Sequence, residues 1–434
     1  MNMRRIRLAA LLAVALFAAP LLVRAANEGA NAYKELGLFG DVLQLVQSDY
    51  VEPVDTDKLI AAALNGMLTS LDPHSSYLDP KSYQEMQVET KGEFGGLGME
   101  VTLKDGLVQV VSPIDDTPAS RAGLQAGDLI IAIDGKSVMG LTLSEAVERL
   151  RGPRNSSVKL TIRRGGAEPY EVTLTREVIK VHPAHAQLYG NIGYLRIAIF
   201  SERADKEVRT ALDSLRHQAG GRLQGLVLDL RDDPGGLLEQ SIAVAGDFLD
   251  SGQIVSTRGR RAQDDQQFKA QGEDLTKGVP MVVLINGGTA SASEIVAGAL
   301  RDNHRAVVMG VRSFGKGTVQ TIIPIPGHGA VRLTTARYYT PSGHSIQDVG
   351  IEPDIVVHVG KADAAKEAKR VREHDLPRAL KNPDGAPARI DKEPSESGTV
   401  MAESASSSSA GDVQLERALD YLRGTSTPKG GARP

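Results

Sequence analysis

The chain lacks cysteine and carries little net charge. None of its 434 residues is a cysteine, so it can form no disulfide, and both thiol catalysis and a cysteine-ligated zinc site are excluded. Its formal net charge of -4 at pH 7 provides no basic field that would draw in nucleic acid. A catalytic nucleophile must therefore be a hydroxyl, an amine or a carboxylate.

The first residues have the pattern of an export signal. The positively charged run MNMRRIR precedes the apolar run LAALLAVALFAAPLLV, and a small-residue cleavage site ends at Ala25, although Ala26 also suits a signal peptidase. We therefore expect residues 1–25 to be a signal peptide. An uncleaved membrane anchor is the alternative, which Pro20 and the short apolar run disfavour. Either way the protein crosses a membrane, and we expect it in a bacterial periplasm, free or membrane-associated.

Hydrophobic periodicity divides the remaining chain into regions of different fold. A helical segment precedes a unit of short alternating strands, and an α/β core follows in which buried strands alternate with helices. A stretch rich in charge, proline and serine then predicts a flexible linker, and the amphipathic run VQLERALDYLRG predicts a final association helix. We place the helical segment at residues 27–90, the unit of short strands at 92–177 and the α/β core at 178–360. The linker covers 361–412 and the final helix 413–424.

Ser291 is a candidate nucleophile at the start of a predicted helix. In NGGTASASEIVAGALR it follows a glycine-rich turn at the end of a strand, where the positive end of the helix dipole stabilises a developing oxyanion. The same letters also form a capping box, in which Ser291 and Glu294 satisfy backbone N–H groups and have no catalytic task. Ser291 alone does not decide between these interpretations.

Lys316 is a better candidate base than any histidine. His304 lies at the far end of the predicted helix, about 20 Å from Ser291 at 1.5 Å per residue, and the other histidines lie in predicted loops. In RSFGKGTVQ, Lys316 lies between two glycines that would let its side chain turn inward, and desolvation would then lower its pKa enough for it to accept a proton. A serine–lysine pair is chemically coherent.

A phosphate-binding loop is a competing interpretation of the same lysine. GVRSFGKGT matches the first part of the G-x-x-x-x-G-K-[ST] motif, but Gly317 stands where a hydroxyl is required. The following run, TVQTIIPI, predicts a strand, whereas that motif leads into a helix. Nucleotide binding is therefore disfavoured.

These segments resemble the C-terminal processing proteases, also called tail-specific proteases, which join a PDZ domain to a serine–lysine core. The family's nucleophile lies in SASE and its base in FGKGTVQ, which implies Ser291 and Lys316 here, with Gln320 as the supporting glutamine. The resemblance covers nearly the whole chain. It implies a multidomain α+β fold: a β-sandwich-like PDZ domain at 92–177, an α/β (crotonase/Clp-like) protease core at 178–360, and helical N- and C-terminal segments.

LDLRDDPGG resembles the family's oxyanion turn. By this correspondence the donors are the N–H groups of Gly235 or Gly236 and of Ala292. Relatives often have asparagine where this chain has Asp232 and Asp233. We expect these two acids to be turn residues that point away from the site; a plain structural turn, or less plausibly a carboxylate pair for glycoside chemistry, is the alternative.

GGLGMEV resembles the carboxylate-binding loop of a PDZ domain. This implies that the backbone N–H groups of Gly96, Leu97, Gly98 and Met99 hold a peptide's C-terminal carboxylate, while the adjacent strand edge pairs with the peptide. The alternative is a purely structural role, in which these glycines only form tight turns between strands.

Together these features predict an exported serine endopeptidase that recognises partly unfolded proteins by their C-terminal tails. The resemblance further implies that the PDZ domain gates the site, that terminal helices build homo-oligomers, and that an adaptor protein could take part. It implies no metal or organic cofactor and no nucleic acid. The alternative function is a PDZ scaffold with a catalytically inactive protease-like core.

Overall fold

The structure is a computed structural model that describes residues 35–113, 117–125, 127–141, 143–180, 182–358, 370–385 and 412–424. The chain divides into two compact units, residues 1–67 and 68–434. The predicted signal peptide lies outside the described residues. Within them, no helix combines the length and the apolar character needed to span a membrane.

Helices form in the N-terminal segment where the apolar spacing predicts them. One helix covers residues 35–49, and α2 follows at Thr56–Thr69. Asp55 sets the start of α2, because its Oδ1 accepts the N–H groups of Asp57 and Lys58 at 3.1 and 3.3 Å.

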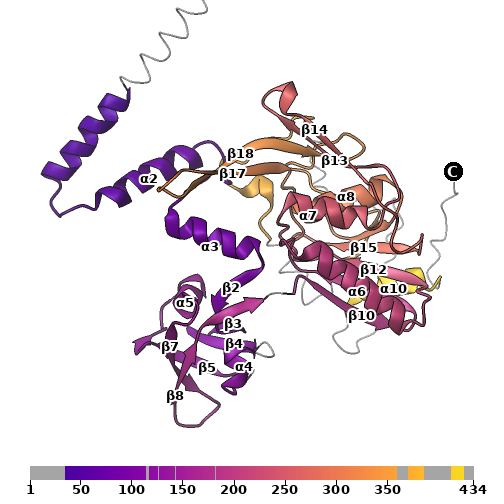
Figure 1. Ribbon diagram of the computed structural model, residues 1–434, viewed down its shortest axis with the longest axis horizontal. Helices are drawn as coiled ribbons and strands as arrows, with labels where there is room; N and C mark the ends of the chain where they lie inside the picture. Colours follow the sequence, from indigo (N-terminus) through magenta and orange to yellow (C-terminus); the bar gives the residue numbers. More distant parts are fainter. Residues whose placement is uncertain are drawn as a thin grey trace, which may run out of the picture. The chain divides into compact units, whose positions relative to one another are not determined.

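The PDZ-like unit is a sheet of short antiparallel strands around its own apolar core (Figure 1). Its strand order is β3-β4-β5-β7-β8, and the short β6 pairs with β5. The strands are Met99–Lys104 (β3), Leu107–Pro113 (β4), Leu129–Ile133 (β5), Lys136–Ser137 (β6), Ser157–Arg163 (β7) and Tyr170–Thr175 (β8), and the helices are Pro118–Arg121 (α4) and Leu143–Leu150 (α5). Before the sheet lies α3 (Pro80–Thr90), and the ribbon β2 (Glu93–Gly96) with β9 (Glu177–Lys180) joins its two ends.

The protease-like core contains a six-stranded sheet in the order β10-β11-β12-β15-β16-β19. β10 is antiparallel to β11, and the other neighbours are parallel, as the predicted alternation of strands and helices requires. The strands are Ala184–Tyr189 (β10), Ile192–Ile197 (β11), Gly225–Asp229 (β12), Met281–Ile285 (β15), Val307–Gly310 (β16) and Ile355–Val356 (β19), and the helices are Ala204–Gln218 (α6), Leu238–Gly246 (α7) and Ala292–Asp302 (α8).

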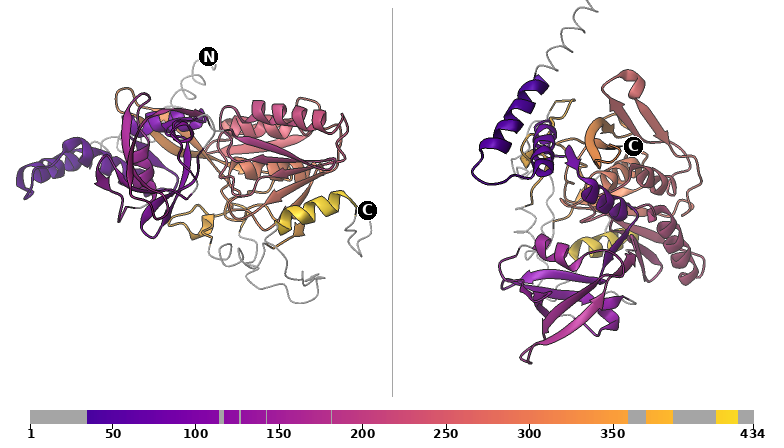
Figure 2. Two further views of the ribbon diagram at one scale, coloured as in Figure 1. Left: turned by 90° about the horizontal axis from the view of Figure 1, so that it is seen from below. Right: turned by 60° about the vertical axis from the view of Figure 1, so that its left-hand side comes forward.

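Both faces of this sheet are buried, each against different helices. On β12, Leu226 and Leu228 pack in the cluster that includes residues of α6, α7 and α8. Val227, between them, points to the opposite face, where it packs in a cluster with Leu415 and Leu419 of α10 (Val413–Leu422). Figure 2 shows α10 across the sheet from α6. The predicted association helix thus has its apolar face buried in its own chain.

A second sheet carries the loop of the candidate base. It has the order β1-β18-β13-β14, and β17 pairs with β18. Its strands are Ser76–Leu78 (β1), Gln253–Gly259 (β13), Gln266–Lys269 (β14), Thr318–Pro324 (β17) and Ala330–Tyr339 (β18), and the short helix η1 (Ala262–Asp264) precedes β14. Because β17 is a strand directly after Lys316, the phosphate-loop interpretation has no helix to support it.

Part of the predicted flexible linker is packed against the core, which corrects its boundaries. Residues 361–369 and 386–411 lie outside the described residues, but residues 370–385 contain the short helix η2 (Glu373–Asp375). Glu373 is fully buried, and its carboxylate lies 2.9 Å from His74 Nε2 and accepts Gln347 Nε2 at 3.0 Å. Polar composition alone missed this segment because its few contacts are with residues distant in sequence.

Candidate active site

Ser291 lies at the turn between a buried strand and a buried helix. All of β15 is buried, and Ser291 directly precedes α8 with backbone angles φ 56° and ψ -114°. A non-glycine residue rarely adopts a positive φ, and keeping it there costs about 1–3 kcal/mol. Such strain concentrates at active sites. The strained turn therefore favours a functional role for Ser291 over that of a simple helix cap.

Glu294 joins this turn to the loop of the candidate base. Its fully buried carboxylate accepts the N–H of Ser291 at 2.7 Å and that of Lys316 at 2.9 Å through Oε2. Its Oε1 accepts Ser313 Oγ at 2.5 Å and the Gly315 N–H at 2.7 Å. Burial raises the pKa of Glu294 to about 7, although these hydrogen bonds pull it downward. The glutamate of the predicted capping box thus also positions the lysine's backbone.

Lys316 lies in a loop that glycines allow to pack closely. Gly315 has φ 97°, and a Cβ at Gly317 would lie 2.3 Å from the backbone nitrogen of Gln347, so both positions require glycine. Burial lowers the pKa of Lys316; the charge of Glu373 acts against this shift and that of Arg332 acts with it. Such a shift increases the fraction of neutral amine, the form that accepts a proton.

The glycines of the LDLRDDPGG turn approach the serine closely. A Cβ at Gly235 would lie 2.6 Å from the carbonyl oxygen of Ala290 and 2.8 Å from the amide nitrogen of Ala292. The Gly235 N–H already donates to Asp233 Oδ1 at 2.9 Å. Of the predicted oxyanion donors, this leaves the N–H groups of Gly236 and Ala292 without an acceptor among the described residues.

One pocket is lined by most of the residues predicted for the active site of the protease-like core. It has a volume of about 570 Å³, and its lining includes Gly235, Gly236, Ser291, Lys316, Gln320 and Tyr338. Gln320 Nε2 donates to Thr318 Oγ1 at 3.0 Å and to Thr334 Oγ1 at 3.3 Å, so in this structure its amide nitrogen faces hydroxyl groups of β17 and β18. Its predicted support of the lysine stays a prediction.

Tyr338 is a pocket residue that sequence reasoning did not find. It lies near the end of β18 and is 4% exposed. Burial raises the pKa of Tyr338 to about 12, and a side-chain hydrogen bond with Ser291 acts in the opposite direction. Nothing in the run ARYYTP distinguishes this tyrosine, because its proximity to Ser291 arises only when the two sheets come together.

The predicted peptide-binding loop precedes a sheet edge in the PDZ-like unit. Gly96 ends β2, Leu97 is buried, and Gly98 has φ 73° at a position where a Cβ would lie 2.2 Å from Thr117. Met99 begins β3, which pairs with β4 and with no other described strand. An extended peptide can therefore add to this edge. The tail-binding role of the loop is still a prediction.

Comparison with known proteins identifies the family. The sequence pattern of peptidase family S41 matches residues 191–357. The chain is 48% identical over 404 residues to a carboxy-terminal-processing protease of Bartonella bacilliformis, which covers 92% of this chain and 91% of the relative. The chain belongs to the carboxy-terminal-processing proteases of peptidase family S41. It is therefore a serine peptidase, as predicted.

Other relatives support the same family assignment, and two further domain matches cover residues outside the S41 match. A carboxyl-terminal-processing protease of Synechocystis is 41% identical over 72% of this chain and 74% of its own length. The carboxy-terminal processing protease CtpA of Bacillus subtilis is 37% identical over 76% of this chain and 70% of its own. A PDZ domain matches residues 109–164, and the N-terminal domain of the activating protease CtpB matches residues 19–82. The predicted fold class is thus confirmed.

Asp233 is enclosed within this turn, and the expectation that both acids of the turn point away from the site stays a prediction. Its side chain is fully buried, and its Oδ2 has no hydrogen-bond partner among the described residues. The carbonyl oxygen of Asp233 accepts the Ala290 N–H at 3.0 Å, so the turn folds back onto the serine loop and encloses the side chain. Asp232, by contrast, is half exposed and pairs with Arg370.

We expect the Asp233→Asn variant to gain stability relative to the wild type when the pH rises from 5 to 8. Burial raises the pKa of Asp233 to about 7 from 3.8. The folded state therefore holds a proton that the unfolded state releases, and the resulting stabilisation is lost as the pH rises through this window. Asparagine carries no such proton, so the difference in unfolding free energy between variant and wild type should grow by about 2–3 kcal/mol between pH 5 and pH 8, which is about 1.36 kcal/mol for each of the two pH units from 5 to 7.

Urea denaturation at the two pH values measures this difference. Asp232→Asn, an adjacent and half-exposed acid, is the matched control. If the variant and the wild type changed in parallel between pH 5 and pH 8, Asp233 would not carry the assigned proton.

Proposed function

We propose that this S41 protease uses Ser291 as its nucleophile and Lys316 as its general base. The observation that carries the proposal is one pocket lined by both residues, with Ser291 on a strained turn and burial lowering the pKa of Lys316. The neutral amine takes the proton of Ser291 Oγ as the oxygen attacks the scissile carbonyl carbon.

The remaining steps use the groups around this pair. The tetrahedral oxyanion accepts the N–H groups of Gly236 and Ala292. The lysine ammonium then protonates the departing amine, which leaves an acyl-enzyme at Ser291. Lys316 next takes a proton from a water molecule that attacks the ester. The bond between the carbonyl carbon and Ser291 Oγ then breaks, and the lysine ammonium returns its proton to Oγ as the new carboxyl group leaves.

The substrates we propose are exported, partly unfolded proteins recognised by their C-terminal tails. The loop from Gly96 to Met99 and the open edge of β3 support tail binding, because backbone N–H groups and a free strand edge suit a terminal carboxylate and an extended chain. Gating of the core by this domain, a periplasmic location and homo-oligomers, with or without an adaptor protein, complete the proposal. The apolar run before Ala25 supports export.

Cleavage of one unfolded protein with two different ends tests the proposal. Wild type should cut the substrate with a free C-terminus about tenfold faster, as kcat/KM, than the same substrate amidated at its end, because amidation removes the charge that the loop binds. Ser291→Ala, run in parallel, reveals any contaminating protease.

Two results would count against parts of this function. Equal rates for the two substrates would remove tail recognition. Equal cleavage by wild type and by Ser291→Ala would remove the serine as nucleophile, and an inactive wild type would favour a binding scaffold.

A further inference from the structure

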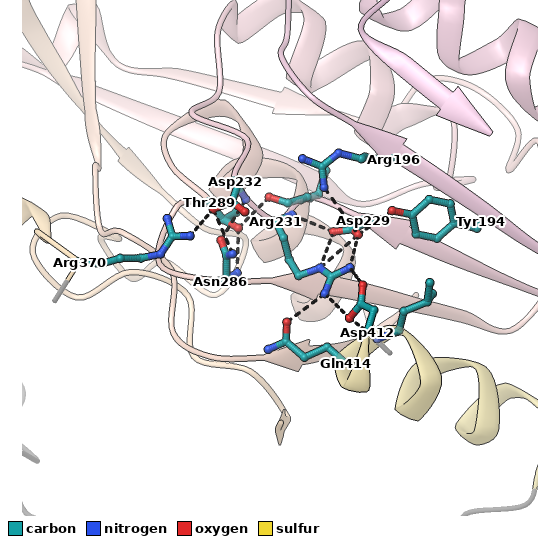
Figure 3. Close-up of polar contacts among 12 residues, drawn as sticks. Tyr194, Arg196, Asp229, Arg231, Asp232, Asn286, Thr289, Arg370, Asp412 and Gln414 are labelled. Atoms are coloured by element: carbon teal, nitrogen blue, oxygen red, sulfur yellow. Dashed lines mark hydrogen bonds and ion pairs between the residues drawn. The ribbon is translucent and has the colours of Figure 1, made fainter. Parts of the chain in front are cut away.

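Arg231 is held between the core sheet and the C-terminal helix. It lies two residues beyond the end of β12 with 12% of its side chain exposed. Its Nε donates to Asp229 Oδ1 at 2.9 Å, and its two terminal nitrogens donate to Asp412 Oδ1 and Oδ2 at 2.8 and 2.6 Å (Figure 3). Gln414 Oε1 accepts a further bond at 3.1 Å. Paired hydrogen bonds between arginine and a carboxylate fix position as well as charge.

The helix brings Asp412 and Gln414 to a fixed place. Asp412 caps α10, because its Oδ1 accepts the Leu415 N–H at 3.1 Å. Gln414 is buried, and its Nε2 donates to the Val357 carbonyl at 2.7 Å. Leu415 and Leu419 pack in the apolar cluster on the sheet. The polar partners of Arg231 are therefore anchored to the core by the helix that carries them.

The segment next to Arg231 is bonded directly to the serine loop. The carbonyl oxygen of Leu230 accepts Thr289 Oγ1 at 2.7 Å. The Asp232 N–H donates to Asn286 Oδ1 at 3.0 Å, and the Ala290 N–H donates to the Asp233 carbonyl at 3.0 Å. The same segment runs on into the turn of Gly235 and Gly236. A displacement of Arg231 would thus reach both halves of the oxyanion site.

A second segment from beyond the core holds the adjacent residue. Arg370 pairs with Asp232, whose Oδ1 also accepts Asn286 Nδ2 at 3.2 Å. Arg231 and Asp232 are neighbours in sequence, yet each has a partner that follows the core in the chain (Figure 3). The turn is thus restrained at two consecutive residues.

Asp229 does not neutralise Arg231 alone. It is fully buried, it also pairs with Arg196 at 3.9 Å, and it accepts the Tyr194 hydroxyl at 2.9 Å. The additional acid from α10 therefore adds geometric restraint to charge balance. Asp412 is 42% exposed, but Arg231 is 12% exposed and Asp229 is buried. Removing Asp412 therefore leaves the mostly buried guanidinium of Arg231 with fewer acceptors, and we expect the local backbone to shift.

We propose that Asp412 and Gln414 are positioning residues of the active site. They hold Arg231, and through it the oxyanion turn, in the arrangement that catalysis needs, so that α10 must be docked for the full catalytic rate. This inference rests on the proposed serine–lysine function.

Kinetics of the full-length protein with a short peptide substrate test the inference. Asp412→Ala is expected to lower kcat about tenfold and to leave KM near the wild-type value, because the oxyanion forms only after substrate binding. Gln414→Leu, which keeps the ion pair, should lower kcat about threefold. Asp412→Glu should recover most of the rate, since it restores the charged acceptor.

The matched control is Glu416→Gln, which removes one negative charge from an exposed position on the same helix. A peptide aldehyde, whose adduct with Ser291 bears the oxyanion, provides a second measurement. Its inhibition constant should rise in Asp412→Ala by about the same factor as kcat falls. A loss of folding would instead lower the concentration of active enzyme and leave the inhibition constant unchanged.

The possible outcomes separate this inference from the proposed function. An active wild type with unchanged kcat in both Asp412→Ala and Gln414→Leu would overturn the inference alone. A rise in KM with constant kcat would also overturn it. Cleavage by Ser291→Ala would overturn the proposed function first. If Asp412→Ala does not fold, Gln414→Leu decides the matter by the same measurements.

Discussion

Ser291→Ala and Lys316→Met are each expected to lower kcat by about ten thousandfold or more, with little change in KM. Alanine removes the attacking oxygen, and methionine fills the volume of the lysine stem without the amine that accepts the proton. In the proposed mechanism the two groups act in one step, so the double variant should be no slower than either single variant. Hydrolysis of a short peptide by the purified proteins measures all three.

Lys81→Met is the control for the lysine substitution, because that side chain is 85% exposed on α3. It should retain about the wild-type rate. If the effects of Ser291→Ala and Lys316→Met multiplied in the double variant, the two residues would act independently and the proton transfer between them would be wrong.

The pH dependence of kcat/KM provides a further test of the lysine. The proposed mechanism requires the neutral amine of Lys316, so activity should rise with pH through the lowered pKa of Lys316. The charge of Arg332 contributes to this lowering. Arg332→Gln should therefore raise the pKa of Lys316 and move the rising limb to higher pH. A limb that moved to lower pH, or did not move, would assign the titration to another group.

Glu294→Gln is expected to lower kcat by about a hundredfold and the unfolding free energy by about 2–4 kcal/mol at pH 8. All four groups that face the Glu294 carboxylate are donors, from Ser291, Ser313, Gly315 and Lys316. A glutamine amide would place its own donors against two of them. Size is conserved in this substitution, so no cavity forms, but the change removes the carboxylate charge that raises the pKa of Lys316 as well as the hydrogen bonds.

Measurements of kcat and of urea denaturation on the same preparations test both parts of this prediction. Glu239→Gln is a suitable control, because Glu239 also lines the pocket but on α7. A Glu294→Gln variant with normal kcat would show that the hydrogen bonds between the serine turn and the lysine loop are not needed for catalysis.

The sequence predicted what depends on local patterns. Strands such as β12 and β15 are continuous apolar runs, and α8 begins directly after the glycine-rich turn with Ser291. The motifs around Ser291 and Lys316 supply two residues that line one pocket. The spacing of glycines also indicated where backbone segments meet, as Gly235 and Gly317 confirm.

What the sequence did not predict depends on contacts between distant segments. Asp233 was predicted as a turn residue, and its burial was not predicted, because only the serine loop, some sixty residues later, encloses it. Tyr338 enters the pocket from the second sheet, and Glu373 packs from a stretch that composition assigned to a linker. The amphipathic pattern of α10 showed that its leucines would be buried, but no pattern states which surface covers them.

The positions of Arg231 and Asp412 in the chain determine when their contact can form during synthesis. The two residues are 181 positions apart, and all of β15, α8 and the lysine loop lie between them. During synthesis, the ribosome adds Ser291 and Lys316 well before Asp412, the acid that binds Arg231. A nascent chain therefore contains the proposed catalytic residues first and gains the contact that restrains Arg231 only after the whole S41 core has been synthesised.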